Sequence, residues 1–293
     1  MMKRKTLILI VLLFLFVLTF GGALEISTEF HIGNLALERS RTSADTTYTG
    51  MYFPWGINVG IKHPINNQIG ISASWIMDPI LRNTLYTQFT FRESFINIAV
   101  GPFFGVFNSS SSILKSGINA VIQVEYPGIV FFRFRADSTI GGRLIETGDY
   151  LQERNDIVFG FYVPNAICSL GLTTKKYTEK VAAGETVDQL TEYFFDTEIF
   201  QKNVPYKVNV RFAYHRLTKT FLEAATTVHG LGSLVVAFRV DVDVTKYLTI
   251  FARLDSSIYT FGTDALLGIT NPGPGGYLFN TGIGCRLDLS NLR

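Results

Sequence analysis

The chain contains 293 residues, of which 47% are hydrophobic, 17% charged and 14% aromatic. So much apolar and aromatic material excludes a disordered polypeptide. The formal net charge of +2 excludes the basic surface that nucleic-acid binding requires, so we expect no nucleic acid among its partners. Three of the cations, Lys3, Arg4 and Lys5, lie in a segment that we expect to be removed, which leaves 23 cations against 24 anions.

The first residues indicate export. The three cations precede an apolar run from Leu7 to Phe20, and small residues follow at 21–23. This run is short for a membrane-spanning helix but suits the core of a signal peptide that is cleaved after Ala23. We therefore expect a signal peptide over residues 1–23 and a single barrel domain over 24–293. The alternative is an uncleaved N-terminal membrane anchor.

Beyond this segment, apolar residues alternate with polar ones. The clearest case lies between Leu234 and Val244, where every second residue is apolar while Arg239, Asp241 and Asp243 occupy the opposite face. A period of two is typical of a β-strand with two different faces. The same alternation recurs at 24–32, 55–61, 69–75, 118–126, 130–136, 206–214 and 279–289.

Connections between these segments alternate in length. Short turns fall near residues 63–68, 92–94, 127–128, 164–165, 201–205 and 245–246. Longer polar or Gly-rich connections are expected over 38–50, 77–84, 108–116, 138–153, 175–189, 217–230 and 256–276. Six short and seven long connections predict about fourteen strands, with twelve as the alternative. An even number of strands with short turns at one end and long loops at the other is typical of a transmembrane β-barrel.

In these features the chain resembles the small single-chain outer-membrane β-barrels of bacteria with two membranes, most of all the fourteen-stranded monomeric porins. The resemblance covers Leu24 to Leu289 and is one of architecture, without a family motif. It implies an all-β, antiparallel up-and-down barrel in the cell outer membrane, surrounded by outer-membrane lipid and inserted by the barrel assembly machinery. Such barrels often end on an aromatic residue, whereas this chain ends in Leu292-Arg293.

The membrane decides which face of each strand points outwards. Unpaired backbone groups cost several kcal/mol each in hydrocarbon, so a sheet spans a bilayer only when it closes on itself. The apolar face must then contact lipid and the polar face must line the interior. A soluble barrel has the reverse arrangement, and it is the alternative fold. Small inward residues such as Gly160, Gly171 and Gly284 favour open space inside.

We expect the inward ionisable groups to line a narrow, hydrated lumen, because dehydrating each of them separately is costly. Some are expected to pair across strands, as Glu198 with Lys207 and Glu125 with Arg133. The residues expected to line the lumen are Glu29, His31, Lys62, Glu125, Arg133, Arg135, Asp137, Glu192, Asp196, Glu198, Lys207, Arg211, His215, Arg239, Asp241, Arg253 and Arg286.

Passive diffusion of ions or small polar solutes is the function that this pattern favours. The alternative is a closed structural barrel or an adhesin-like surface protein that uses the expected loops Glu38–Gly50, Lys175–Gln189 and Ser256–Gly276. We do not expect an enzyme, because no His is followed two positions later by the Ser that outer-membrane lipid hydrolases use. No metal or cofactor is expected, since the two cysteines are isolated in the sequence.

Overall fold

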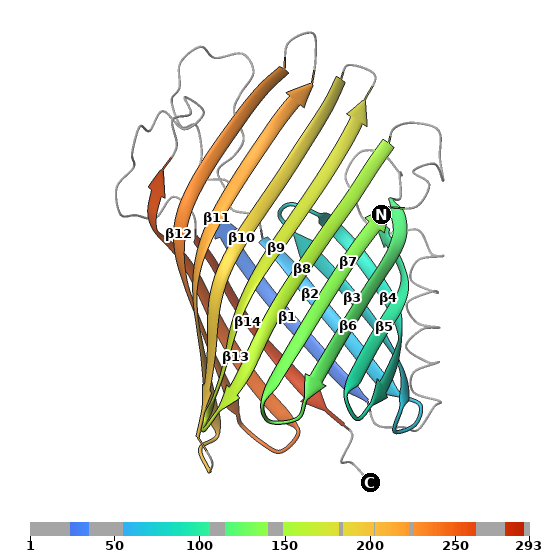
Figure 1. Ribbon diagram of the computed structural model, residues 1–293, viewed down its shortest axis with the longest axis vertical. Helices are drawn as coiled ribbons and strands as arrows, with labels where there is room; N and C mark the ends of the chain where they lie inside the picture. The colour runs from blue at the N-terminus through green and yellow to red at the C-terminus, as the bar shows by residue number, and fades with distance from the viewer. Residues whose placement is uncertain are drawn as a thin grey trace.

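The computed structural model is a closed antiparallel β-barrel (Figure 1). It describes residues 24–34, 55–105, 115–139, 149–181, 184–201, 203–222, 226–261 and 279–289. The signal peptide expected over 1–23 therefore lies outside the described residues. No helix long and apolar enough to cross a membrane occurs in the part of the chain that is described.

The barrel is built from strands that follow one another in chain order. They are β1 (Glu25–Asn34), β2 (Trp55–Pro64), β3 (Ile69–Asp78), β4 (Arg82–Glu93), β5 (Ile96–Gly105), β6 (Ser116–Tyr126), β7 (Val130–Thr139), β8 (Asp149–Val163), β9 (Ala166–Val181), β10 (Gly184–Phe200), β11 (Tyr206–Leu222), β12 (Thr226–Asp243), β13 (Leu248–Phe261) and β14 (Phe279–Asp288).

Pairing between the first and last strands closes the barrel. The ladder between β1 and β14 runs without interruption from Glu25 opposite Asp288 to Asn34 opposite Phe279. Every other pair joins strands that are neighbours in the sequence. The up-and-down topology with fourteen strands is therefore confirmed, and the alternative of twelve is wrong.

Six tight turns join the strands at one end of the barrel, which we call the turn end. Their residues have the conformations that such turns need. The Asn66 side chain accepts hydrogen bonds from the backbone N–H groups of Gln68 and Ile69 at 2.8 and 2.6 Å. Gly128, in the turn between β6 and β7, has a φ of 73°, which a glycine adopts without strain. The short connections predicted from the sequence are confirmed.

The opposite end, the loop end, differs from expectation on one side of the barrel. Strands β8 to β13 are 14 to 18 residues long and rise beyond the others (Figure 1). The long connection expected over 175–189 is wrong, because β9 continues to Val181 and β10 begins at Gly184. Polar residues occupy both faces of such extensions, so the alternation that marks a lipid-facing strand is lost there.

Large apolar side chains cover the outside of the barrel. Phe89 is 67% exposed, Ile283 63% and Phe212 54%, and each lies at an outward position of its strand. The clearest strand of the sequence follows the same rule, since Leu234, Phe238 and other apolar residues of β12 are exposed. Such an inside-out surface fits hydrocarbon and not water. The outward direction of the apolar face is thus confirmed, and the soluble alternative is wrong.

Candidate functional site

A polar cavity of about 760 Å³ lies inside the barrel, along strands β9 to β14. On β11 every second residue from Lys207 to Leu217 lines it. At about 3.3 Å per residue this stretch is about 33 Å long, which is comparable to the thickness of a bilayer core once the strand tilt is included. The cavity is therefore elongated along the barrel.

Most of the residues expected to line the lumen do line this cavity. They are His31, Arg133, Glu192, Asp196, Glu198, Lys207, Arg211, His215, Arg239, Asp241, Arg253 and Arg286. The structure brings them together from β1, β7 and β10 to β14, strands that are far apart in the sequence.

Five expected lining residues, Glu29, Lys62, Glu125, Arg135 and Asp137, are not in the cavity wall, although their strands direct them inwards. Glu29 lies 3.8 Å from Arg253. Lys62 is exposed at the turn end, where its Nζ lies 3.4 Å from a carboxylate oxygen of Glu25. Glu125 accepts a 2.7 Å hydrogen bond from the Tyr162 hydroxyl, and the ion pair expected between Glu125 and Arg133 does not form. Strand register explains this, because Glu125 lies opposite Phe131.

Arg135 and Asp137 belong to a buried network between β4 and β8. Asp137 accepts hydrogen bonds from the Tyr86 hydroxyl at 2.8 Å and from the Gln152 amide at 3.1 Å, and Asn119 also donates to it. Arg135 Nε lies 3.1 Å from the same carboxylate. Apart from Arg135, the described partners of Asp137 are almost completely inaccessible to solvent. This side of the barrel interior is therefore filled and not open.

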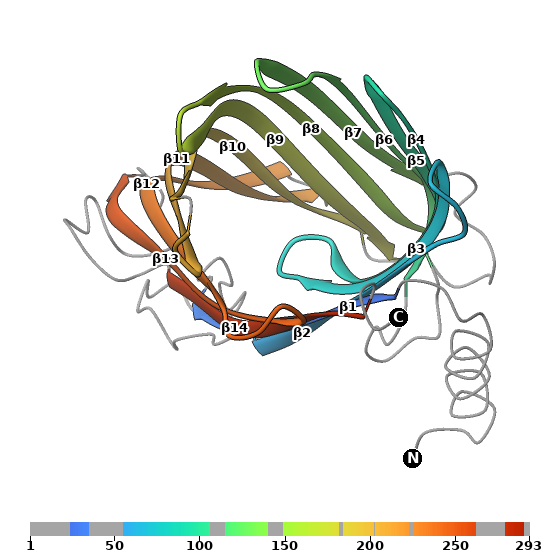
Figure 2. The ribbon, with the colours of Figure 1, turned by 90° about the horizontal axis from the view of Figure 1, so that it is seen from below.

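The turn between β3 and β4 folds into the lumen (Figure 2). Only residues 79–81 separate the two strands, so the long connection expected over 77–84 is wrong. Asp78 closes the turn, since its Oδ1 accepts hydrogen bonds from the backbone N–H groups of Ile80 and Leu81 at 2.8 and 3.0 Å. Both apolar side chains are buried inside the barrel.

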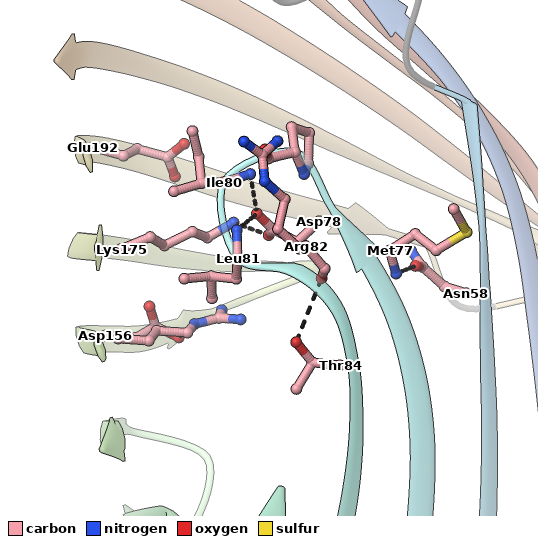
Figure 3. Close-up of polar contacts among 12 residues, drawn as sticks. Asn58, Met77, Asp78, Ile80, Leu81, Arg82, Thr84, Asp156, Lys175 and Glu192 are labelled. Atoms are coloured by element: carbon pink, nitrogen blue, oxygen red, sulfur yellow. Dashed lines mark hydrogen bonds and ion pairs between the residues drawn. The ribbon is translucent and has the colours of Figure 1, made fainter. Parts of the chain in front are cut away.

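Two ion pairs tether this turn to the opposite wall, and Figure 3 shows the one between Asp78 and Lys175. The Asp78 carboxylate pairs with Lys175 of β9 at 2.5 Å, and Arg82 pairs with Asp188 of β10 at 2.9 Å. Lys115, which precedes β6, donates a hydrogen bond to the carbonyl of Leu81. The tethered turn separates the filled side, around the Asp137 network, from the open cavity, whose wall is formed mostly by β9 to β14.

Ion pairs within and between strands follow the wall of the open cavity. Arg211 contacts Glu192 at 3.0 Å and Asp196 at 2.7 Å, while the expected pair between Lys207 and Glu198 is present at 4.0 Å. Nearer β13 and β14, Asp241 lies 2.6 Å from Arg239 and 3.4 Å from Arg286, and Arg253 lies 3.0 Å from Asp255. The wall therefore consists of charged groups of both signs.

Inward glycines accommodate aromatic rings in this wall, contrary to the open space that we expected from them. A Cβ at Gly171 would lie 2.2 Å from the Phe194 ring, and one at Gly284 would lie 2.5 Å from the Phe251 ring. Each ring can therefore lie over the neighbouring strand, where the glycine has no side chain. Small inward residues are a weak guide to lumen width, because a large neighbour can cover them.

Several residues of the site gave no signal in the sequence. Asp78, Arg82, Lys175 and Asp188 fell in expected loops, and only Asp78-Pro79 had the composition of a turn. Among the described residues, no group of three or more His, Cys, Asp and Glu could hold a metal ion. Cys168 and Cys285 are both free thiols.

Comparisons with known proteins show similarity in architecture alone. No family model matches the chain, and no curated protein matches it. The outer-membrane protein OmpT of Vibrio cholerae is similar over 90% of this chain and 96% of its own, with 7% identity and a TM-score of 0.44. A porin is similar over 90% of this chain and 99% of its own, with 8% identity and a TM-score of 0.42.

The translocator domain of the autotransporter NalP from Neisseria meningitidis is also similar. It covers 91% of this chain and 88% of its own, with 13% identity and a TM-score of 0.41. The resemblance to outer-membrane barrels rests on the closed, fourteen-stranded barrel itself. No function follows from similarities this distant.

Proposed function

We propose that the protein is an outer-membrane channel for the passive diffusion of ions or small polar solutes. The observation that supports this proposal best is the polar cavity, which extends for about 33 Å along β11 inside a closed barrel. Charged side chains inside a barrel must either pair with one another or contact water or a polar solute. We also propose that the protein carries out no catalysis.

The number of strands is consistent with a narrow pore. Side chains fill eight-stranded barrels, whereas barrels of sixteen to eighteen strands hold an aqueous channel. A barrel of fourteen strands lies between these sizes. Here the tethered β3–β4 turn and the buried network narrow it further, so the path for solutes lies beside β9 to β14.

Single-channel recording tests this proposal. The purified full-length protein, reconstituted into planar lipid bilayers in potassium chloride, should give uniform step currents. Circular dichroism and the faster migration of unheated protein in detergent gels should establish that the barrel is folded in the same preparation. Folded protein that inserts into the bilayer without carrying current would contradict the proposal and favour a closed structural or surface-interaction barrel.

Of the loops assigned to that alternative, Lys175–Gln189 belongs largely to β9 and β10. This segment forms a strand extension instead of a free loop. The loop expected over Glu38–Gly50 lies outside the described residues, and so does the greater part of Ser256–Gly276.

Release of the β3–β4 turn should widen the pore. In the double variant Arg82→Gln and Lys175→Gln, both ion pairs that hold the turn against β9 and β10 are lost. We expect a larger unit conductance and greater current noise, because the turn can then move within the lumen. The variant Lys176→Gln is the control. Lys176 lies on the outward face of β9, where its Nζ is 3.9 Å from a carboxylate oxygen of Glu153. An unchanged conductance in the folded double variant would show that the turn does not limit the pore.

A further inference from the structure

Four neighbouring strands each place an arginine on the cavity wall. Arg211 of β11, Arg239 of β12, Arg253 of β13 and Arg286 of β14 all line the cavity, and we call them the arginine face. Arg239 and Arg253 lie directly opposite each other across the β12–β13 ladder. Like charges at directly opposite positions destabilise a sheet. Folding alone therefore gives no reason for this arrangement.

The carboxylates that pair with these arginines lie deeper in the wall. The Arg211 side chain is 35% exposed and its partner Asp196 is 15% exposed, while Arg286 is 41% exposed and its partner Asp241 is 17% exposed. In the pairs Arg239–Asp241 and Arg253–Glu29 the arginine side chain is likewise more exposed than the carboxylate. The numbers of charges nearly balance, but in each of these pairs the arginine side chain is more accessible to a solute in the cavity than its carboxylate partner.

Aromatic rings fix the orientation of two of these guanidinium groups. The guanidinium carbon of Arg211 lies 4.2 Å from the centre of the Phe194 ring, and that of Arg239 lies 4.1 Å from the centre of the Phe251 ring. A guanidinium stacked on a ring makes its hydrogen bonds at its edge, in its own plane. Arg211 and Arg239 each use two edge nitrogens for carboxylates of the wall, and the other N–H groups of the five on each guanidinium can donate to a ligand. Less conformational entropy is then lost when a ligand accepts hydrogen bonds from such a guanidinium.

Positive charge on the wall is incompletely neutralised. Arg133 of β7 lines the same cavity, and it forms no ion pair with any residue that the structure describes. Asp241 is shared between Arg239 and Arg286. Glu25 and Asp243, two carboxylates at the turn end, are not among the residues that line the cavity, and Glu25 pairs with Lys62.

We propose that the arginine face and Arg133 bind the carboxylate or phosphate group of small anionic solutes, so that the channel prefers anions. This inference rests on the proposed channel function and specifies its solute class. Guanidinium groups bind carboxylates and phosphates through paired, charge-assisted hydrogen bonds. A cleft with one sign of charge at its surface also concentrates ions of the opposite sign.

The zero-current potential across a gradient of potassium chloride measures this preference. We expect the wild-type channel to be selective for chloride over potassium. The double variant Arg133→Gln and Arg286→Gln should lower the permeability ratio of chloride to potassium by about two- to five-fold, the effect of unit charges a few ångströms from the path in water. Neither substitution leaves a described carboxylate without an ion-pair partner that it had before, since Asp241 retains Arg239. The variant Arg216→Gln removes an arginine from the opposite face of β11 and should leave the ratio unchanged.

Citrate binding provides a second measurement that does not depend on current. Calorimetric titration of folded protein in detergent with citrate should give binding that weakens severalfold in the double variant and not in Arg216→Gln. Step currents without anion preference, together with no citrate binding, would overturn the inference and leave the channel proposal standing. Citrate binding without step currents would overturn the channel and retain the anion site.

Discussion

Val236→Arg is expected to destabilise the folded barrel by about 2–4 kcal/mol, the cost of a cation on the lipid face near the middle of a bilayer. Val236 has the same strand parity as the exposed Leu234 and Phe238 of β12. Its neighbours across the ladders are Phe212 of β11 and Ser256 of β13. A guanidinium group at this position has no water within reach when the barrel is in a membrane.

The next residue provides a matched control. Ala237 lines the polar cavity, so Ala237→Arg should change the free energy of unfolding by only about 0.5 kcal/mol, as at a hydrated surface. Both variants should be unfolded with urea in lipid vesicles and followed by tryptophan fluorescence. If Ala237→Arg proved the more damaging of the two, lipid would not surround the apolar face.

Much of the fold could be predicted because the membrane imposes simple rules on the sequence. Lipid on one side and water on the other force a strict alternation, which is visible from Leu234 to Val244 and sets the inward direction of Arg239 and Asp241. The tight turns are equally visible, because Pro127-Gly128 and Pro164-Asn165 interrupt this alternation. Strand number, strand parity and most of the cavity wall follow from these two patterns.

The division of the interior could not be predicted, because it depends on contacts between distant residues. Lys175 lies 97 positions from Asp78, and Asp188 lies 106 positions from Arg82. Nothing in the sequence indicates that a turn will fold inwards and meet them across the lumen. Strand parity likewise assigns Arg135 to the inside without showing whether it meets a solute or a buried network.

Asp137→Ala should destabilise the barrel by about 3–5 kcal/mol, the range observed when one member of a buried ion pair is removed. Asp137 is 3% exposed and accepts hydrogen bonds from Tyr86, Asn119 and Gln152 in addition to its contact with Arg135. After the substitution these donors remain buried without their acceptor, which carries its own penalty. The free energy of unfolding in vesicles measures the loss.

Arg133→Gln, two residues before Arg135 on the same face of β7, is the matched control. It removes a charge that forms no ion pair with the described residues, so its effect on stability should be small. The two variants also separate the two halves of the interior. Asp137→Ala weakens the filled side and leaves the cavity wall intact, so the ion selectivity of the remaining folded channels should be retained. A loss of stability below about 1 kcal/mol would mean that water reaches Asp137 and that this side of the barrel is not sealed.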